Sequence, residues 1–179
     1  MATIFTHAAV GAVLKSSFPK FVNQNKRIWF WCLFLTILPD ADVLAFVFGI
    51  PYEAALGHRG FTHSILFALL MCPLVSYVIF KPESKLIKKQ LTILFFLCMM
   101  SHGLLDALTN GGLGIGFFIP FDNTRYFFPW TPIEVSPIGR NFFSMNGVVT
   151  LLSELKVVII PLVILIFSKL IFRKFKKKA

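Results

Sequence analysis

Histidine and aspartate recur in this chain at positions where apolar residues dominate. The stretch SHGLLDAL places His102 and Asp106 at the end of an apolar run that begins at Leu91. A spacing of four residues puts the two side chains on one face of a helix, where both can bind one cation. An ionisable residue is costly in hydrocarbon unless it pairs, faces a polar cavity or binds an ion. The pair is therefore a candidate functional site.

The remaining histidines and most of the aspartates are expected at the same depth in a membrane as His102 and Asp106. The chain has four histidines, and three of its four aspartates accompany them. Imidazole and carboxylate groups without thiolate suit zinc or another divalent transition ion. Unpaired ionisable groups are too costly to gather in a membrane by chance, so their convergence favours a metal site. The residues concerned are His7, Asp40, Asp42, His58, His63, His102 and Asp106.

Each motif taken singly also has a simpler interpretation. His102 and Asp106 could form a buried hydrogen bond, and the PDAD motif at Pro39 could be a helix break with a cap. Thr62 could cap the next helix, and Arg59 could extend to a lipid phosphate. These alternatives explain the motifs one at a time, but they leave the shared depth unexplained.

The composition is that of an integral membrane protein. Of the 179 residues, 56% are apolar and 22 are phenylalanine, and the mean hydropathy is +0.77, far above that of a soluble domain. Runs near the ~20 residues that span a bilayer cover residues 28–50, 61–80, 91–108 and 155–172. Residues 3–14 form a shorter run that could be a fifth span, a half-span or an interfacial helix. We expect one all-α domain over residues 1–179, a polytopic membrane bundle of four to five transmembrane helices.

The basic residues predict the orientation of the bundle. Three segments, residues 15–27, 81–89 and 169–178, carry 14 of the 18 Lys and Arg residues. Cytoplasmic loops carry the excess of Lys and Arg, so residues 51–60 and 109–153 are expected on the outer side together with the candidate site. The net charge of +10 thus reflects topology and affinity for anionic lipids. Basic residues split among three segments do not form the single stripe of a nucleic-acid-binding protein.

Several ordered motifs resemble those of the YdjM-like family of bacterial inner-membrane proteins. They are THAAVG, LPDAD, HRGFTHS, SHGLLDALTNGG and the aromatic stretches FFIPF and RYFFPWTPI, which together run over almost the whole chain. The family is predicted to consist of metal-dependent hydrolases. The resemblance therefore implies a multi-pass protein of the bacterial inner membrane with hydrolase activity that depends on a divalent metal.

A more distant similarity is to zinc-dependent phospholipases C and fungal single-strand nucleases, which are helical enzymes with a metal cluster. The order of ligands in those enzymes, carried over, implies metal binding by His7, Asp40, His63 or His58, His102 and a bridging Asp106. Those enzymes also use an N-terminal tryptophan, a second histidine and a His-x-x-x-Glu pair, whereas this chain has no histidine after His102. At least one metal site is therefore missing or rebuilt, with Glu134 or Asp122 as candidates, and we expect one or two ions.

Residues and resemblance together predict a membrane-bound phosphoesterase that acts on a lipid phosphate or phosphodiester at the outer face. Asp42 or His58 would accept a proton or orient a metal ligand. A forked guanidinium can bind phosphate, and the candidates for that role are Arg59, Arg125 and Arg140. Residues 111–147, rich in glycine and aromatic residues, are either a lid or an aromatic belt with interfacial loops.

The alternative is a non-enzymatic membrane protein, either a metal-binding scaffold or an ion transporter. A broken helix such as that at Pro39 occurs in carriers, but five or fewer spans without repeat symmetry are poorly suited to alternating access. A membrane protease is a third class, and the chain lacks its His-Glu-x-x-His signature.

Overall fold

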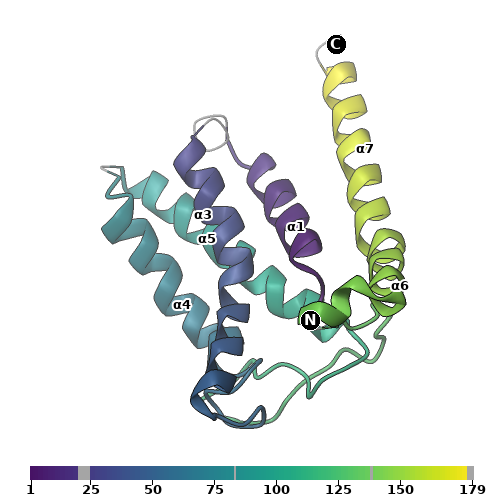
Figure 1. Cartoon of the computed structure of the whole chain (residues 1–179). Helices are drawn as coiled ribbons and strands as arrows, with labels where there is room; N and C mark the ends of the chain where they lie inside the picture. Colours follow the sequence, from purple (N-terminus) through teal and green to yellow (C-terminus); the bar gives the residue numbers. More distant parts are fainter. Residues whose placement is uncertain (20–24, 83, 138, 177–179) are drawn as a thin grey trace.

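The computed structural model describes residues 1–19, 25–82, 84–137 and 139–176, and the elements in this part of the chain are helical (Figure 1). The α-helices are α1 (Ile4–Ser16), α3 (Lys26–Ile37), α4 (Ile65–Leu74), α5 (Lys85–Ala107), α6 (Met145–Glu154) and α7 (Ile160–Lys176). Shorter 3-10 and π-helical segments are η1 (Leu38–Phe48), η2 (Phe61–His63), η3 (Val75–Ile79), η4 (Gly139–Phe143) and η5 (Leu155–Ile159). The described residues contain no β-strand, so the predicted all-α class is confirmed.

Five apolar helical stretches make up the bundle. Lys26–Phe48, Lys85–Ala107 and Met145–Ile171 are long and apolar enough to cross a membrane, whereas Ile4–Ser16 and Ile65–Ile79 are apolar but shorter. The short first helix and the bundle of membrane helices match the sequence-based prediction. The stretch expected at residues 61–80 is shorter because its helix begins only after Ser64.

The start of α4 corrects one interpretation of the sequence. The side chain of Ser64, not that of Thr62, caps the helix and accepts a hydrogen bond from the Phe67 backbone N–H at 3.0 Å. Thr62 lies in the 3-10 turn η2 and donates its hydroxyl to Asp42 at 2.7 Å. The turn before the helix therefore directs its side chains into the bundle.

A proline changes the winding of the second apolar stretch, as predicted. Proline has no backbone N–H and clashes with the preceding helical turn, and α3 gives way to the 3-10 helix η1 at Leu38, one residue before Pro39. The helix then ends at Gly49, whose φ of 71° lies in the left-handed region that glycine adopts without strain. Within η1, Asp40 lies next to His102 of α5, whereas Asp42 contacts His58 in the loop that follows.

Close packing of α1 against α3 brings a third element, α1, to the place where η1 meets α5. A Cβ atom at Gly11 would lie 2.8 Å from Cγ2 of Thr36, so a side chain at this position would separate the two helices. On the other side of α3, a buried apolar core joins it to α4 and α5, with members that include Cys32, Leu35, Leu94, Phe95 and Cys98. The three cysteines are free and buried in this core, where they pack as apolar residues.

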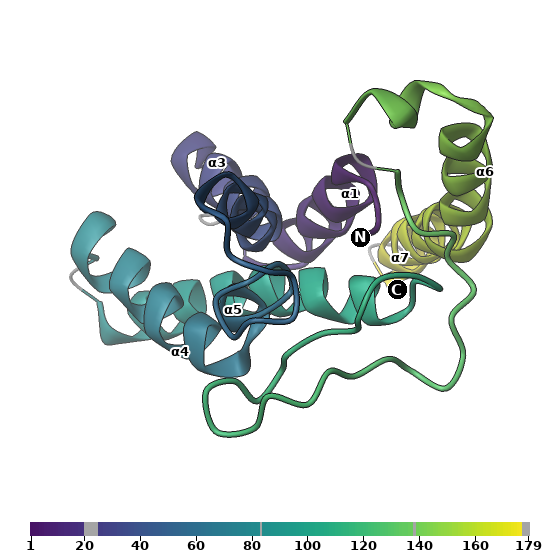
Figure 2. The same cartoon turned by 60° about the horizontal axis from the view of Figure 1, so that its bottom comes forward.

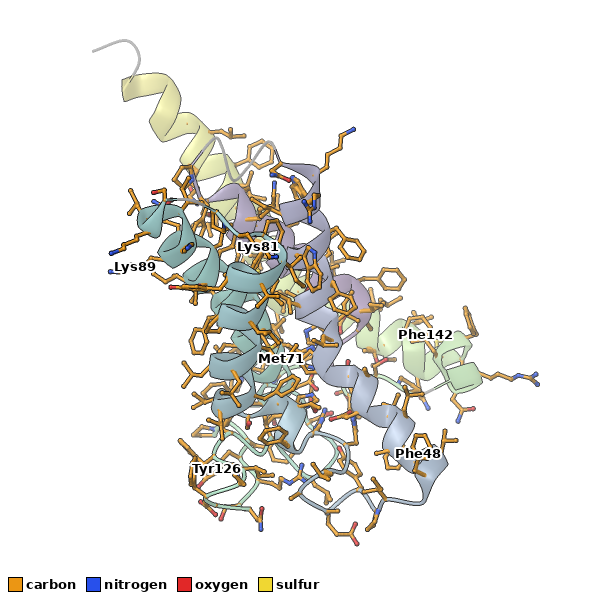
Figure 3. The ribbon with its side chains drawn as sticks, turned by 90° about the vertical axis from the view of Figure 1, so that its left-hand side faces the viewer. Phe48, Met71, Lys81, Lys89, Tyr126 and Phe142 are labelled. Carbon is orange, nitrogen blue, oxygen red and sulfur yellow. The ribbon has the colours of Figure 1, made fainter. Side chains whose placement is uncertain are left out.

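The two ends of the bundle differ in charge and structure. Lys81 and Lys89 lie at one end, and Phe48 and Tyr126 lie toward the other (Figure 3). Residues 108–137, which follow α5, cross that second end without a regular helix or strand (Figure 2). Among the predicted cytoplasmic residues, Lys20, Lys177 and Lys178 lie outside the described part of the chain.

Accessibility of single cysteines tests the predicted orientation. In a background with Cys32, Cys72 and Cys98 replaced by alanine, Ser84→Cys is expected to be shielded from an impermeant thiol reagent in intact cells, and Asn123→Cys is expected to react. Both native residues are exposed on the protein surface, so the membrane and not the fold decides the difference. Labelling of Ser84→Cys without labelling of Asn123→Cys would reverse the orientation.

Candidate metal site

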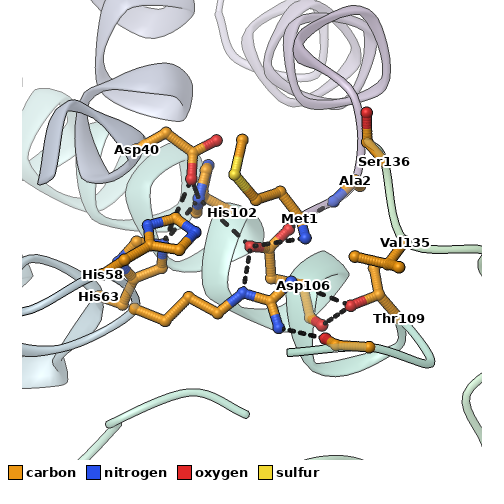
Figure 4. Close-up of polar contacts among 12 residues, drawn as sticks. Met1, Ala2, Asp40, His58, His63, His102, Asp106, Thr109, Val135 and Ser136 are labelled. Carbon is orange, nitrogen blue, oxygen red and sulfur yellow. Dashed lines mark hydrogen bonds and ion pairs between the residues drawn. The ribbon is translucent and has the colours of Figure 1, made fainter. Parts of the chain in front are cut away.

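Polar side chains from four elements meet inside the bundle, and Figure 4 labels Asp40, His63, His102 and Asp106 among them. His7 comes from α1, Asp40 from η1, His63 from η2, and His102 and Asp106 from α5. The side chains of His63, His102 and Asp106 are fully shielded, that of His7 is 1% exposed, and that of Asp40 is 15% exposed. The structure thus brings together these five residues, and their depth in the membrane and their role as metal ligands stay predictions.

The hydrogen-bond partner of Nδ1 determines the tautomer of two histidines in the site. Nδ1 of His102 lies 2.7 Å from the carbonyl oxygen of Thr36, and Nδ1 of His63 lies 3.1 Å from a carboxylate oxygen of Asp42. Both partners can only accept, so each neutral ring carries its proton on Nδ1 and has a lone pair on Nε2. The two Nε2 atoms are 3.0 Å apart. Two lone pairs at this separation need a proton or a cation between them.

Two carboxylates face the same point. Oδ1 of Asp40 lies 3.3 Å from Nε2 of His102 and 3.7 Å from Nε2 of His63, and Oδ2 of Asp106 lies 3.9 Å from Nε2 of His102. These two oxygen atoms are buried and have no hydrogen-bond partner among the described residues. Asp40, His63, His102 and Asp106 each offer one ligand atom within 4.8 Å of the other three, and we call them the four-residue cluster. Two imidazoles and two carboxylates suit a divalent cation such as zinc.

His7 lies against this cluster. Its ring stacks on that of His102, with centroids 3.9 Å apart and planes at 16°, and its Nε2 lies 3.3 Å from Oδ1 of Asp106. Neither ring nitrogen of His7 has a hydrogen-bond partner within the described part of the chain. The structure brings His7 to the site, and its role as a ligand stays a prediction.

Asp42 orients two histidines and does not itself belong to the four-residue cluster. Its Oδ1 lies 2.6 Å from Nδ1 of His58, and its Oδ2 accepts hydrogen bonds from the Thr62 hydroxyl at 2.7 Å and the Arg59 backbone N–H at 2.9 Å. His58 forms a second possible ligand group with Asp40 and Asp42. The sequence left open whether His58 or His63 is a metal ligand. The structure places His63, and not His58, in the four-residue cluster.

Arg59 has a different environment from the one expected. Its side chain is fully buried, so the interpretation that it extends to a lipid phosphate is wrong. Nε lies 3.4 Å from Oδ2 of Asp106, Nη1 donates to the carbonyl oxygen of Gly111 at 2.7 Å, and Nη2 donates to Oγ1 of Thr109 at 3.1 Å. These contacts place its cationic group on one flank of Asp106 and engage the donors that would have bound substrate phosphate.

The backbone of Arg59 is also unusual. Its φ of 62° lies in the left-handed region, which non-glycine residues adopt at a cost of about 1–3 kcal/mol when strained. Asp42 accepts a hydrogen bond from the Arg59 N–H, and the Gly116 N–H donates to the Arg59 carbonyl, both at 2.9 Å. Gly112 lies beside the guanidinium, where a Cβ would be 2.7 Å from Nη1 of Arg59. The surrounding structure thus holds the residue in this conformation.

The other two predicted phosphate ligands lie apart from the four-residue cluster. The Arg125 guanidinium donates to the backbone carbonyls of His58, Tyr52 and Ala54 and thereby supports the loop that carries Arg59. Burial lowers the pKa of Arg125. Arg140 is exposed in η4. Neither contact pattern corresponds to the predicted phosphate site.

The two carboxylates proposed to rebuild a second metal site are also elsewhere. Glu134 accepts a hydrogen bond from the Asn110 side chain at 2.8 Å, on the exposed surface. Asp122 is exposed and accepts from the Thr124 N–H and the Tyr126 hydroxyl, both at 2.8 Å. The hydrogen bonds from Thr124 lower the pKa of Asp122. Both residues lie outside the ligand groups found in the described chain.

Sequence analysis missed Glu154, which is buried at the end of α6. Its carboxylate accepts hydrogen bonds from the backbone N–H of Thr3 and from the hydroxyls of Thr3 and Thr6. These bonds fix the segment in which the Ala2 N–H donates to Oδ1 of Asp106 at 2.7 Å. The available signal was a carboxylate directly before the last apolar run.

The fold and the site together define a helical membrane protein with a buried cluster of histidine and aspartate. The family model described as YdjM inner membrane protein matches residues 1–178. The chain belongs to the YdjM family, as the motifs predicted.

A relative with a known name supports the same assignment. The inner membrane protein YbcI of Escherichia coli strain K12 is 36% identical to this chain over 162 residues, which cover 90% of this chain and 92% of the relative. Together with the apolar helices, these descriptions support the predicted location in the inner membrane. No solved structure matches the chain.

Metal content of purified variants tests the four-residue cluster. Asp106→Asn keeps the shape of the side chain but removes the charge that offsets a cation, so we expect bound zinc to fall at least about tenfold by elemental analysis, comparable to losses from altered metal sites. Asp122→Asn, which also removes one carboxylate charge, is the matched control and is expected to retain the metal. Equal metal content in the two variants would show that Asp106 is not a ligand.

Proposed function

We propose that this protein is a membrane-embedded, metal-dependent hydrolase of phosphate esters carried by lipids. The observation that carries the proposal is the pair of Nε2 atoms of His63 and His102, 3.0 Å apart, with carboxylate oxygens of Asp40 and Asp106 beside them that have no hydrogen-bond partner among the described residues. Ligand atoms gathered in this way are expensive to bury unless a cation joins them. The resemblance to metal-dependent hydrolases supports the same assignment.

The charges at the site favour one divalent ion. Three carboxylates, those of Asp40, Asp42 and Asp106, lie at the site, and two cationic groups flank Asp106: Nε of Arg59 lies 3.4 Å and the Met1 ammonium nitrogen 3.9 Å from its Oδ2. With neutral imidazoles this leaves one net negative charge, which one divalent cation already exceeds, so a second ion is disfavoured. Because Arg59 lies 3.4 Å from Oδ2 of Asp106, its charge takes the place of a second cation on that carboxylate. Of the one or two ions expected, we therefore propose one, held by the four-residue cluster.

A divalent ion in this position supplies a Lewis acid for a phosphoryl oxygen and lowers the pKa of water at the reacting phosphorus. The net reaction adds a water oxygen to phosphorus, breaks the bond between phosphorus and the ester oxygen, and transfers one water proton to the departing alcohol. His58 suits that transfer, since its Nδ1 is engaged by Asp42 at 2.6 Å and its Nε2 can take up and return the proton. Asp42 is a positioning residue for His58 and His63.

Two features support a lipid phosphate as the substrate. The reacting groups lie within a bundle whose helices are apolar on the outside, so a substrate from the bilayer reaches them without passing through water. The basic ends of the helices lie opposite the loop that carries Arg59, which favours a site near the outer head groups. Head groups at that level present phosphate monoesters and diesters.

Hydrolysis assays on purified protein in nanodiscs test this function. We expect zinc-dependent release of phosphate or alcohol from at least one probe among phosphatidic acid, phosphatidylglycerol and a polyprenyl phosphate. His58→Gln is expected to retain zinc and to lower kcat by about 100-fold or more, the range for loss of a general acid or base. Tyr126→Phe, which removes only a hydroxyl whose hydrogen bond to Asp122 is exposed, is the control and should retain activity.

The alternative class predicts a different outcome. A metal carrier or a metal-binding scaffold holds the ion with the same residues but hydrolyses none of the probes. Zinc flux into proteoliposomes together with full metal content and no hydrolysis would contradict the proposed function and favour transport.

A further inference from the structure

An apolar groove of about 510 Å³ lies between the start of α1, the junction of α3 with η1, and η4. Its apolar lining consists mainly of Ile4, Phe5, Ile37, Val43, Phe142 and Phe143. Phe5 is 63% exposed and Phe143 is 89% exposed, so the groove opens on the outer surface of the bundle. The volume is in the range of about 300–1,000 Å³ that is typical of ligand sites.

Asp40 connects this groove to the four-residue cluster. It is the charged side chain among the described residues that line the groove, and it is also a member of the cluster. Its side chain is 15% exposed, whereas those of His63, His102 and Asp106 have no exposed surface. An incoming group therefore meets the cluster from the groove, at Asp40.

We infer that the groove binds one acyl chain of a phosphate-bearing lipid and so positions the lipid phosphate at Asp40 beside the metal ion. This inference rests on the proposed function and specifies its substrate as a molecule with a long apolar chain. The lining is apolar, which matches a hydrocarbon chain and excludes a free phosphate ion from most of the groove. The Asp40 carboxylate repels an anion, and both the ammonium group of Met1, which also lines the groove, and a cation bound by the cluster oppose that repulsion. Metal binding therefore favours occupation by the lipid phosphate.

The dimensions favour a single flexible chain over a protein segment. A helix with side chains is about 10–12 Å across and rises about 5.4 Å per turn, so two turns already exceed the volume of the groove. The phenylalanines of η4 and the aliphatic residues Ile37 and Val43 offer apolar contacts to a hydrocarbon chain. The groove thus selects for the shape of a lipid tail as well as for its polarity.

A pair of variants on one helix tests the role of the groove. Val43→Trp fills it, and Leu44→Trp adds the same side chain at the next position, where the native residue is 59% exposed and does not line the groove. The probes are dioleoyl phosphatidic acid in nanodiscs and water-soluble p-nitrophenyl phosphate. We expect Val43→Trp to slow hydrolysis of the lipid about tenfold or more, the effect of losing contact with about two methylene groups.

The short probe and the control variant show whether the effect of Val43→Trp depends on the acyl chain of the substrate. Hydrolysis of p-nitrophenyl phosphate by Val43→Trp is expected to stay close to that of the native protein, and Leu44→Trp is expected to retain both activities. An equal loss on both probes would overturn the inference, because a filled groove should affect only the substrate with a chain. Hydrolysis of p-nitrophenyl phosphate by the native protein without hydrolysis of the lipid would also overturn it.

A binding measurement separates this inference from the proposed function. Phosphatidic acid with a diazirine at the end of one acyl chain is activated by light in zinc-loaded nanodiscs, and labelled peptides are identified by mass spectrometry. We expect labels on Ile37 or Phe142 in the native protein and in Leu44→Trp, and about tenfold less label in Val43→Trp. If the native protein hydrolyses neither probe, the proposed function fails, and this labelling pattern still supports the groove. Equal labelling in all three proteins would overturn it.

Discussion

Two imidazole rings whose Nε2 atoms meet inside a membrane bundle are the constraint on which the rest of this structure depends. In a low-dielectric interior, two facing lone pairs repel each other unless a proton or a cation lies between them, and carboxylate oxygens without a hydrogen-bond partner add to the cost. The four-residue cluster has this arrangement, with its Nε2 atoms 3.0 Å apart. Under the proposed function, a divalent cation turns these groups into ligands and so offsets the cost of burying them.

The helices around the cluster are shaped to hold its members in place. Gly11 lets α1 pack closely against α3. The carbonyl oxygen of Thr36 in α3 accepts from Nδ1 of His102 and so determines its tautomer. Pro39 ends the α-helical winding of α3, and the resulting 3-10 helix directs Asp40 and Asp42 to different partners. Arg59 adopts a left-handed backbone conformation and places its charge against Asp106. Local departures from regular helix thus occur where the cluster needs them.

Sequence patterns were sufficient to predict the class of fold and the residues that meet. Apolar runs indicated the helices, proline indicated the break at Pro39, and the four-residue spacing indicated the shared face of His102 and Asp106. The tertiary contacts of individual site residues could not be predicted from such patterns. The choice between His58 and His63, and the role of Arg59, depend on how a loop folds back onto α5, and no local spacing encodes that path.

Long-range contacts account for the predictions that were wrong. Arg59 was interpreted as a residue that could reach lipid phosphate because an arginine near a membrane surface often does so, but contacts with Thr109 and Gly111, about fifty positions away, bury it instead.

X-ray absorption of the zinc-loaded protein tests the central claim most directly. The account predicts a first shell of nitrogen and oxygen with scattering from two imidazole rings and no second metal. A shell that contains sulfur, or that lacks imidazole scattering, would contradict it.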